Sequence, residues 1–262
     1  MGTGALTSYF DVAQVVLYAF WIFFFGLVYY LHRETKREGY PIEVDTPNGE
    51  VKTMGWPDAP TAKTFNLPHG QGSRTVPGPR PDEYEVAATP MWRSSGAPLQ
   101  PTGDPMVDGV GPAAWAIRPE TPDLTEDGAP KIVPLRAAPG FGLTKRDPDP
   151  RGMSVVGCDG VVGGKVTEAW VDRAEPIIRY LEVAVGEVAD GEEGTSVLLP
   201  MTMARVKRNN TVVVNSIRGD QFAGVPKLAN ADQVTLQEED KITAYYGGGT
   251  LYATPTRSEP LL

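Results

Sequence analysis

The sequence predicts one membrane-spanning helix at the N-terminus, then an irregular extended segment, then a small antiparallel β barrel, with the mainly β part in the cytoplasm. Two observations indicate this fold class. Residues 12–31 carry no charged side chain, and a helix of that length is about 30 Å long, which matches the hydrocarbon core of a bilayer. Short β-type runs separated by turn residues begin at Met153 and continue to about Val225, which is the pattern of a small barrel.

The charges beside the helix predict its orientation. The first ten residues hold no Lys or Arg, whereas Arg33, Lys36 and Arg37 follow the apolar stretch directly. By the positive-inside rule, residues 1–11 lie in the periplasm and the bulk of the chain lies in the cytoplasm. A cleavable signal peptide would need a basic stretch before a shorter apolar core and small residues after it, and none of these is present.

The spanning stretch is richer in aromatic residues than a simple lipid anchor needs to be. Tyr29 and Tyr30 near the charged end suit an interfacial belt. Trp21 lies too deep for such a belt, and Gln14 would be costly facing lipid. We therefore expect this helix to pack against other membrane helices.

Composition excludes several classes of function. The formal net charge of -9 argues against nucleic acid as a partner, because phosphate binding needs a basic face. The single Cys158 excludes an internal disulfide, and with only His32 and His69 a metal centre or a His-based triad is not expected. No P-loop or dinucleotide fingerprint is present. We expect neither catalytic residues nor a cofactor or metal bound by this chain, and a membrane-anchored hydrolase lacks a nucleophile and base.

The segment from residue 32 to residue 150 is dominated by proline. Twenty of the 25 prolines fall between Tyr40 and Arg151, and proline fixes φ and removes a backbone donor, so long helices and central strands are not expected. Phe65, Trp92 and Trp115 recur through the segment, whereas disordered chains are poor in aromatic residues. The prediction is an ordered, extended strap laid over the surface of a partner.

Residues 151–250 are expected to form the barrel. Residues 172–176 are short enough for a hairpin, and 190–194 and 207–210 are further turn signals. Alternation places Val166, Glu168, Trp170 and Asp172 on one face of the first long strand. In the next strand it places Ile177, Arg179, Leu181, Val183 and Val185 together. Residues 232–241 predict one short helix, with Tyr245 to Leu262 loosely attached and 251–262 as a C-terminal tail.

Several phrases, spread in order along the whole chain, are similar to one known family. They are AFWIFFFGLVYYL, REGYP, KTFNLPHG, PTGDPMVDGVGPAAW, PKIVPLRAAPGF, GKVTEAWVDRAEPIIRYLEV and VTLQEEDKITAYYGGGTLYA. The chain resembles the H subunit of the photosynthetic reaction centre of purple bacteria, a protein with a PRC-barrel. The resemblance implies a cap on the cytoplasmic face of the L and M subunits in the inner (intracytoplasmic) membrane, in contact with membrane lipids. A cytochrome subunit and a light-harvesting ring are left open.

The same resemblance implies a role in electron and proton transfer without a cofactor on this chain. Bacteriochlorophyll, bacteriopheophytin, ubiquinone or menaquinone, and non-haem iron are expected in the partner subunits. Carried over by position, Glu175 and Asp172 are expected to relay protons to the secondary quinone or to tune its electrostatics. Arg179 would be their counter-charge, and Asp127 would lie near the point of proton uptake.

These residues also have ordinary interpretations. Asp172 could simply open the hairpin turn, Glu175 could be a solvated turn residue, and Arg179 could form a surface ion pair of little energetic value. The acidic loop around Asp127 contains no histidine, although some relatives have a histidine pair there, so a metal-inhibited histidine entrance is not expected. The competing function is a bitopic, membrane-anchored PRC-barrel module that recruits a soluble partner, with the helix as a tether.

Overall fold

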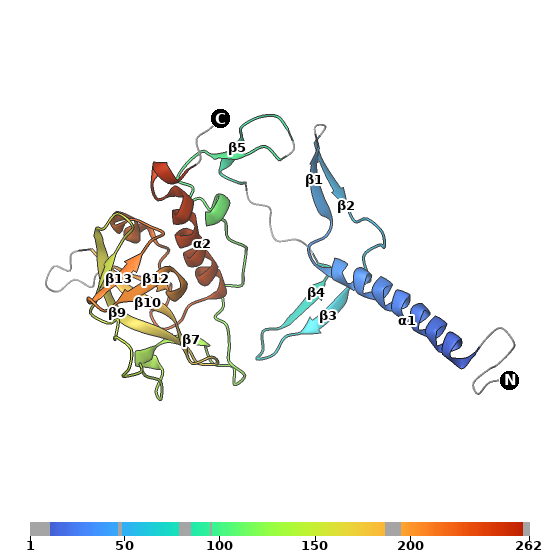
Figure 1. Cartoon of the computed structure of the whole chain (residues 1–262), viewed down its shortest axis with the longest axis horizontal. Coiled ribbons are helices and arrows are strands. Elements are labelled where there is room, and N and C mark those ends of the chain that lie inside the picture. Colours follow the sequence, from blue (N-terminus) through green and yellow to red (C-terminus); the bar gives the residue numbers. More distant parts are fainter. Residues whose placement is uncertain (1–10, 47–48, 79–84, 95, 187–194, 259–262) are drawn as a thin grey trace. The chain divides into compact units, whose positions relative to one another are not determined.

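The computed structural model describes residues 11–46, 49–78, 85–94, 96–186 and 195–258. The chain forms two compact units (Figure 1). The first, here called the N-terminal unit, comprises Met1–Glu83 and Trp92–Pro98. The second, the C-terminal unit, comprises Tyr84–Met91 and Leu99–Leu262.

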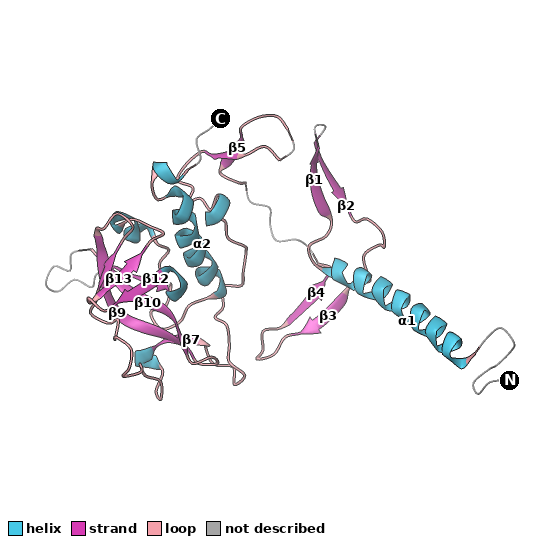
Figure 2. Cartoon of the chain, viewed as in Figure 1, coloured by secondary structure: helices cyan, strands magenta, loops and turns pink. Residues whose placement is uncertain are grey.

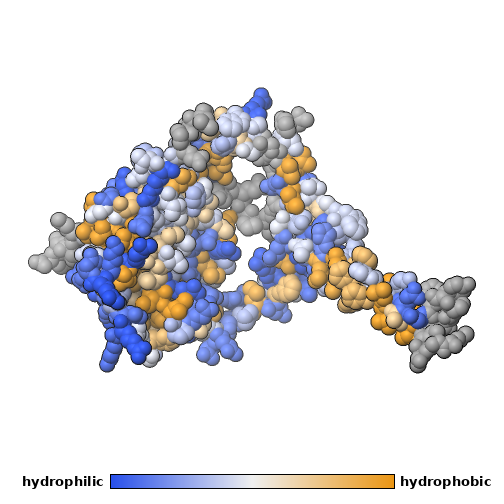
Figure 3. All heavy atoms as spheres, viewed as in Figure 1, coloured by the Kyte–Doolittle hydropathy of each residue, from blue (hydrophilic) through white to orange (hydrophobic). Residues whose placement is uncertain are grey.

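The first helix of the N-terminal unit is α1, Val12–Glu34. Asp11 caps it by accepting a hydrogen bond from the Gln14 amide at 2.7 Å. Among the described residues, this is the one helix long and apolar enough to cross a membrane. Its side chains are not buried by the rest of the chain, and Figure 3 shows the apolar surface that they form. The apolar helix predicted for residues 12–31 is therefore present, and it continues to Glu34.

The proline-rich segment is more regular than the sequence predicts, because it forms short hairpins. In the N-terminal unit, β1 (Ile42–Thr46) pairs with β2 (Gly49–Thr53), and β3 (Lys63–Asn66) pairs with β4 (Ser73–Val76). In the C-terminal unit, β5 (Ala88–Pro90) pairs with β6 (Leu99–Pro101). As expected, the described part of the segment contains no long helix.

The C-terminal unit is built on a seven-stranded sheet in its described part, drawn in magenta in Figure 2. The strand order is β11, β10, β9, β8, β13, β12, and β7 pairs with β9 outside this path. Neighbours are antiparallel except β8 and β13, which are parallel. The strands are β7 Ile132–Pro134, β8 Ser154–Val156, β9 Val162–Asp172, β10 Ile177–Val185, β11 Thr195–Pro200, β12 Ala204–Lys207 and β13 Thr211–Val214. Short 3-10 helices cover Thr35–Arg37, Gly111–Ala113, Leu135–Ala137, Met201–Met203, Gly219–Gly224 and Pro255–Arg257.

Two of the three predicted turns are confirmed. Asp172 ends β9 and Ile177 begins β10, and β12 and β13 are joined through residues 208–210. The turn predicted at 190–194 lies outside the described residues. β7 belongs to the proline-rich segment, yet it is buried and adds a strand to the main sheet.

The predicted alternation of faces holds only in part. In β9, Val166 and Trp170 are buried as expected, but Val171 is buried too, because it packs with Val133 and Ala138 on the other face. In β10 a register irregularity falls between Ile178 and Tyr180. Leu181 and Val183, after this irregularity, are buried as predicted, whereas Ile177 and Arg179 of the same predicted face are exposed.

The prediction for the C-terminus was wrong. Helix α2 spans Leu236–Tyr252 rather than 232–241, and it lies along one side of the sheet (Figure 1). Tyr245 and Tyr246, expected in a loose tail, are 5% and 0% exposed and belong to the main core. Thr235 caps the helix in a capping box with Glu238.

Glycine explains how α2 packs so closely. A Cβ at Gly249 would lie 2.5 Å from both Ile217 Cγ2 and the Ser216 carbonyl oxygen, and one at Gly248 would lie 2.5 Å from Ala113 Cβ. The glycines of α2 therefore form a packing surface.

Gly249→Ala tests this packing. Alanine favours helix by about 1 kcal/mol over glycine, but the added methyl group meets backbone, so we expect a net loss of roughly 1–3 kcal/mol in unfolding free energy. Denaturant unfolding of the full chain in detergent, followed by fluorescence of buried Trp170, measures it. Thr250→Ala, at an exposed position on the same helix, is the control. Stabilisation by Gly249→Ala would contradict the packing explanation.

Lys36 fastens the loop after β2 to the end of α1. Its side chain is 2% exposed, and Nζ donates to the carbonyl oxygens of Met54 at 2.5 Å and Pro57 at 2.6 Å. Arg37 likewise donates to the Thr61 and Val76 carbonyls. The cations that predict orientation are therefore also structural.

Lys36→Ala should loosen the N-terminal unit, because two carbonyl oxygens lose their donor at a cost of about 1–3 kcal/mol each if they stay buried. We expect faster amide hydrogen exchange in residues 52–61 of the full chain in detergent. Arg33→Ala removes the same charge one turn earlier and should change exchange little. Equal exchange in both variants would show that Lys36 is not a fastening residue.

Candidate functional site

The centre of the candidate site is Asp172, the last residue of β9. Its side chain is 0% exposed. Oδ1 accepts hydrogen bonds from the backbone amides of Ala174 at 2.9 Å and Glu175 at 3.0 Å. Asp172 therefore does close the hairpin turn, as its ordinary interpretation suggested.

The second oxygen of the same carboxylate faces two cations. Arg179 of β10 lies 3.1 Å from Oδ2 through Nη2 and 3.2 Å through Nε, and Lys131 Nζ lies at 3.7 Å. Burial by itself raises the pKa of Asp172, but the two amides, Arg179 and Lys131 together lower it below its ordinary value. Asp172 is therefore ionised at neutral pH.

The charges continue in both directions from Asp172. Lys131 Nζ lies 3.3 Å from Asp123 Oδ2, and Arg179 Nη2 lies 3.9 Å from Glu175 Oε2. We call these five residues, Asp123, Lys131, Asp172, Arg179 and Glu175, the charge network. It links the acidic loop before β7 to the tip of the β9–β10 hairpin.

The two ends of the charge network differ from its centre in exposure. The Glu175 side chain is 67% exposed and that of Asp123 is 46% exposed. Burial lowers the pKa of Lys131, but Asp123 and Asp172 raise it more, so the net pKa is raised and the ammonium stays charged. A fixed ionic centre thus separates two carboxylates that water reaches.

The structure brings together three of the four residues singled out from the sequence. Asp172, Glu175 and Arg179 are in contact, whereas Asp127 is exposed and forms no ion pair within the described part of the chain. Sequence reasoning missed Asp123 and Lys131. The signal available for Lys131 was its position before the apolar run 132–134, but only the pairing of β7 with β9 places it beside Asp172.

A second carboxylate in the sheet has a purely structural setting. Glu182 of β10 accepts hydrogen bonds from Arg136 at 2.9 Å, Trp170 Nε1 at 3.0 Å and Ser196 Oγ at 3.0 Å. Burial raises the pKa of Glu182, but the three donors lower it by more than burial raises it. The net pKa is lowered, so Glu182 too remains ionised.

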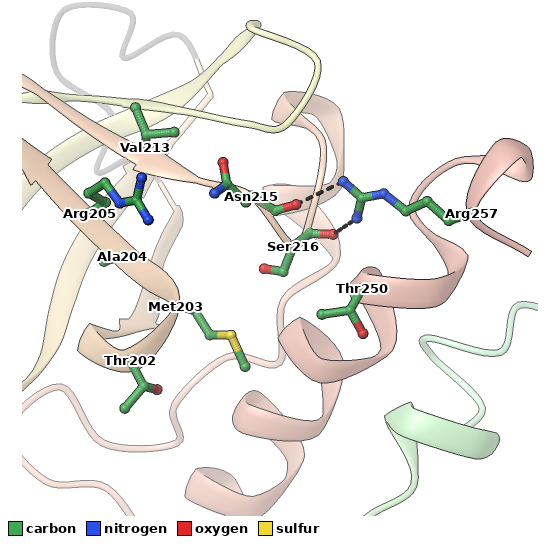
Figure 4. A pocket seen from close by; sticks show the side chains of 9 residues that line it. All are labelled: Thr202, Met203, Ala204, Arg205, Val213, Asn215, Ser216, Thr250 and Arg257. Carbon is green, nitrogen blue, oxygen red and sulfur yellow. Dashed lines mark hydrogen bonds between the residues drawn. The ribbon is translucent and has the colours of Figure 1, made fainter.

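A groove of about 320 Å³ lies elsewhere in the C-terminal unit, among β12, β13 and α2 (Figure 4). Its residues are Thr202, Met203, Ala204, Arg205, Val213, Asn215, Ser216, Thr250 and Arg257. Arg257 donates to the carbonyl oxygens of Ser216 at 2.7 Å and Asn215 at 2.8 Å, as the dashed lines show. This guanidinium therefore holds the end of β13 to the segment after α2. The described residues contain no cluster of three His, Cys, Asp or Glu side chains suited to a metal ion.

The chain thus combines an N-terminal helix apolar enough to cross a membrane with a mainly β C-terminal unit. Comparison with known families gives two matches. The photosynthetic reaction centre H-chain N-terminal region matches residues 4–137, and the PRC-barrel domain matches residues 144–221. The chain belongs to the photosynthetic reaction centre H-chain family. It is therefore the H subunit of an electron-transfer complex, associated with a reaction-centre core whose cofactors sit in partner subunits.

Asp172→Asn tests whether the buried carboxylate holds the charge network together. Asparagine can still accept one turn hydrogen bond but removes the buried counter-charge that Arg179 and Lys131 share, and leaves them only the more exposed Glu175 and Asp123. We therefore expect a loss of about 3 kcal/mol. Because the pKa of Asp172 is lowered in the folded state, the stability it contributes is present above its unfolded pKa of about 3.9 and is lost as the pH falls through the folded value.

Thermal unfolding of the full chain in detergent between pH 2 and pH 7 measures both effects. The wild type should lose more stability on acidification than Asp172→Asn does. Parallel pH curves would contradict the assignment of a lowered pKa to Asp172.

Proposed function

We propose that this subunit caps the cytoplasmic face of the L and M subunits, stabilises the complex and assists proton transfer to the secondary quinone. The N-terminus would lie in the periplasm and the C-terminal unit in the cytoplasm, as the cations after α1 indicate. The pigments, the quinones and the non-haem iron would be carried by the partner subunits. Two family matches and the apolar α1 support this assignment.

The observation that carries the proton-transfer proposal is the unequal solvation of two neighbouring carboxylates. Asp172 receives two amides and two cations and is ionised at neutral pH. Within the described part of the chain, the Glu175 carboxylate forms an ion pair with Arg179 alone, at 3.9 Å, and the side chain is 67% exposed at the hairpin tip. A relay group must be able to exchange protons. Glu175 lacks the donors that hold Asp172, so we assign the relay to Glu175 and the positioning of Arg179 to Asp172.

Proton uptake would begin at the acidic loop. Glu126 and Asp127 are exposed carboxylates, and Asp123 of the same loop is the first member of the charge network. Carboxylates at this edge attract protons from water and favour their passage along a negative surface. Docking of the hairpin tip on the core would then exclude water from Glu175 and place it on the route to the quinone.

Glu175→Gln tests this function in the assembled complex. It keeps the size of the side chain and removes its proton exchange, so we expect the proton-coupled second electron transfer to the secondary quinone to slow roughly tenfold or more. The first electron transfer should change little. Flash-induced decay of the semiquinone signal measures both rates.

Glu120→Gln is the matched control, since Glu120 is exposed and lies outside the charge network. Pigment absorption of the purified complex confirms that each variant assembles. If Glu175→Gln assembles and transfers the second electron as fast as the wild type, Glu175 has no place on the proton route.

A further inference from the structure

A carboxylate of α2, that of Glu239, contacts β10, the strand that also carries Arg179 of the charge network. Glu239 lies in the first turn of α2, and its amide donates to the Thr235 carbonyl at 2.9 Å. Its half-buried side chain accepts a hydrogen bond from the Tyr180 hydroxyl of β10 at 2.7 Å. Tyr180 is the residue after Arg179 on β10, and the charges of Arg179, Lys131 and Asp123 act on the Glu239 carboxyl group.

The partners of Glu239 distinguish it from the two fixed carboxylates. Asp172 and Glu182 each accept hydrogen bonds from an arginine and from further donors, whereas the bond to Glu239 comes from a neutral hydroxyl. Burial raises the pKa of Tyr180, so this hydroxyl stays protonated and remains a donor. A carboxylate held by one neutral donor is much easier to protonate than one held by cations.

The charged groups that face Glu239 come from three elements. Arg179 lies on β10, and Lys131 and Asp123 lie before β7. On α2 itself, Glu238 accepts from the amides of Ala229 and Thr235, and Asp240 accepts from the Ala116 amide. Burial raises the pKa of Glu239; Tyr180, Arg179 and Lys131 lower it, Asp123 raises it, and the net pKa is raised.

We propose that Glu239 is a second protonatable group of the relay and sets the charge of the network around Glu175. This inference rests on the proposed function. Glu239 takes a proton from water, forming an O–H bond on its own carboxylate, and releases that proton when the surroundings become less negative. Ionised, it shares Arg179 and Lys131 with Asp172 and makes the hairpin tip more negative, which favours proton uptake by Glu175. Neutral, it leaves both cations to Asp172. Glu239 therefore acts through Glu175 as a positioning residue.

The pH profile of the second electron transfer tests this assignment in the assembled complex. Glu239→Gln is permanently neutral, so it should match the wild type at low pH and fall behind it, roughly threefold, above the pH at which Glu239 ionises. Tyr180→Phe keeps the carboxyl group but removes the donor that favours its ionised form. The break in its profile should therefore move to higher pH, by about half a unit or more.

The double variant Tyr180→Phe/Glu239→Gln should follow the profile of Glu239→Gln alone, because the hydroxyl acts only through the carboxyl group. Infrared spectra of the dark complex give a second readout. A carboxylic C=O band should be absent from Glu239→Gln and should persist to higher pH in Tyr180→Phe than in the wild type. Glu120→Gln again controls for the loss of one charge.

A constant ratio between the Glu239→Gln and wild-type rates at every pH, or a carboxylic band unchanged by either substitution, would overturn the assignment. Glu175→Gln separates the two proposals. If it slows the second electron transfer while Glu239→Gln shows a flat ratio, only the role of Glu239 is wrong. If Glu175→Gln has no effect, the proton-transfer function itself is wrong.

Discussion

The buried carboxylate of Asp172 is the interaction on which the charged edge of the barrel depends. It stands where three strands meet, since Ile132 of β7 and Ile177 of β10 are both in register with it. One oxygen closes the β9–β10 turn and the other holds Arg179 and Lys131. Because an unpaired buried charge is costly, the turn, the docking of β7 and the placing of both cations form one cooperative arrangement.

The carboxylates of the C-terminal unit differ in the hydrogen-bond donors that surround them. Those that meet arginine and several further donors, Asp172 and Glu182, have lowered pKa values and serve as fixed charges. Glu175 and Glu239 meet fewer donors, and for Glu239 burial raises the pKa. Under the proposed function, the fixed charges position their neighbours, and Glu175 and Glu239 exchange protons. The subunit would then influence quinone chemistry through the potential that it presents to the core.

Local signals in the sequence were enough for the spanning helix and for the hairpin at 172–176. That hairpin brings Asp172, Glu175 and Arg179 together within eight residues, so the centre of the site was predictable. Lys131 and Asp123 were not, because they reach Asp172 only through the long-range pairing of β7 with β9. Helix α2 extends eleven residues beyond the predicted end at residue 241, through Gly247, Gly248 and Gly249, although glycine weakens helix propensity. The structure uses Gly248 and Gly249 for close packing against Ala113 and Ser216.

The decisive measurement is the structure of the assembled complex with its L and M subunits. We expect the core to cover the hairpin tip, so that the Glu175 side chain, 67% exposed in the isolated chain, becomes buried while Asp172 keeps its contacts to Arg179 and Lys131. A hairpin tip that faces bulk water on the outside of the complex would rule out Glu175 as a relay to the quinone. An Asp172 carboxylate that has parted from both cations would contradict the positioning role of Asp172.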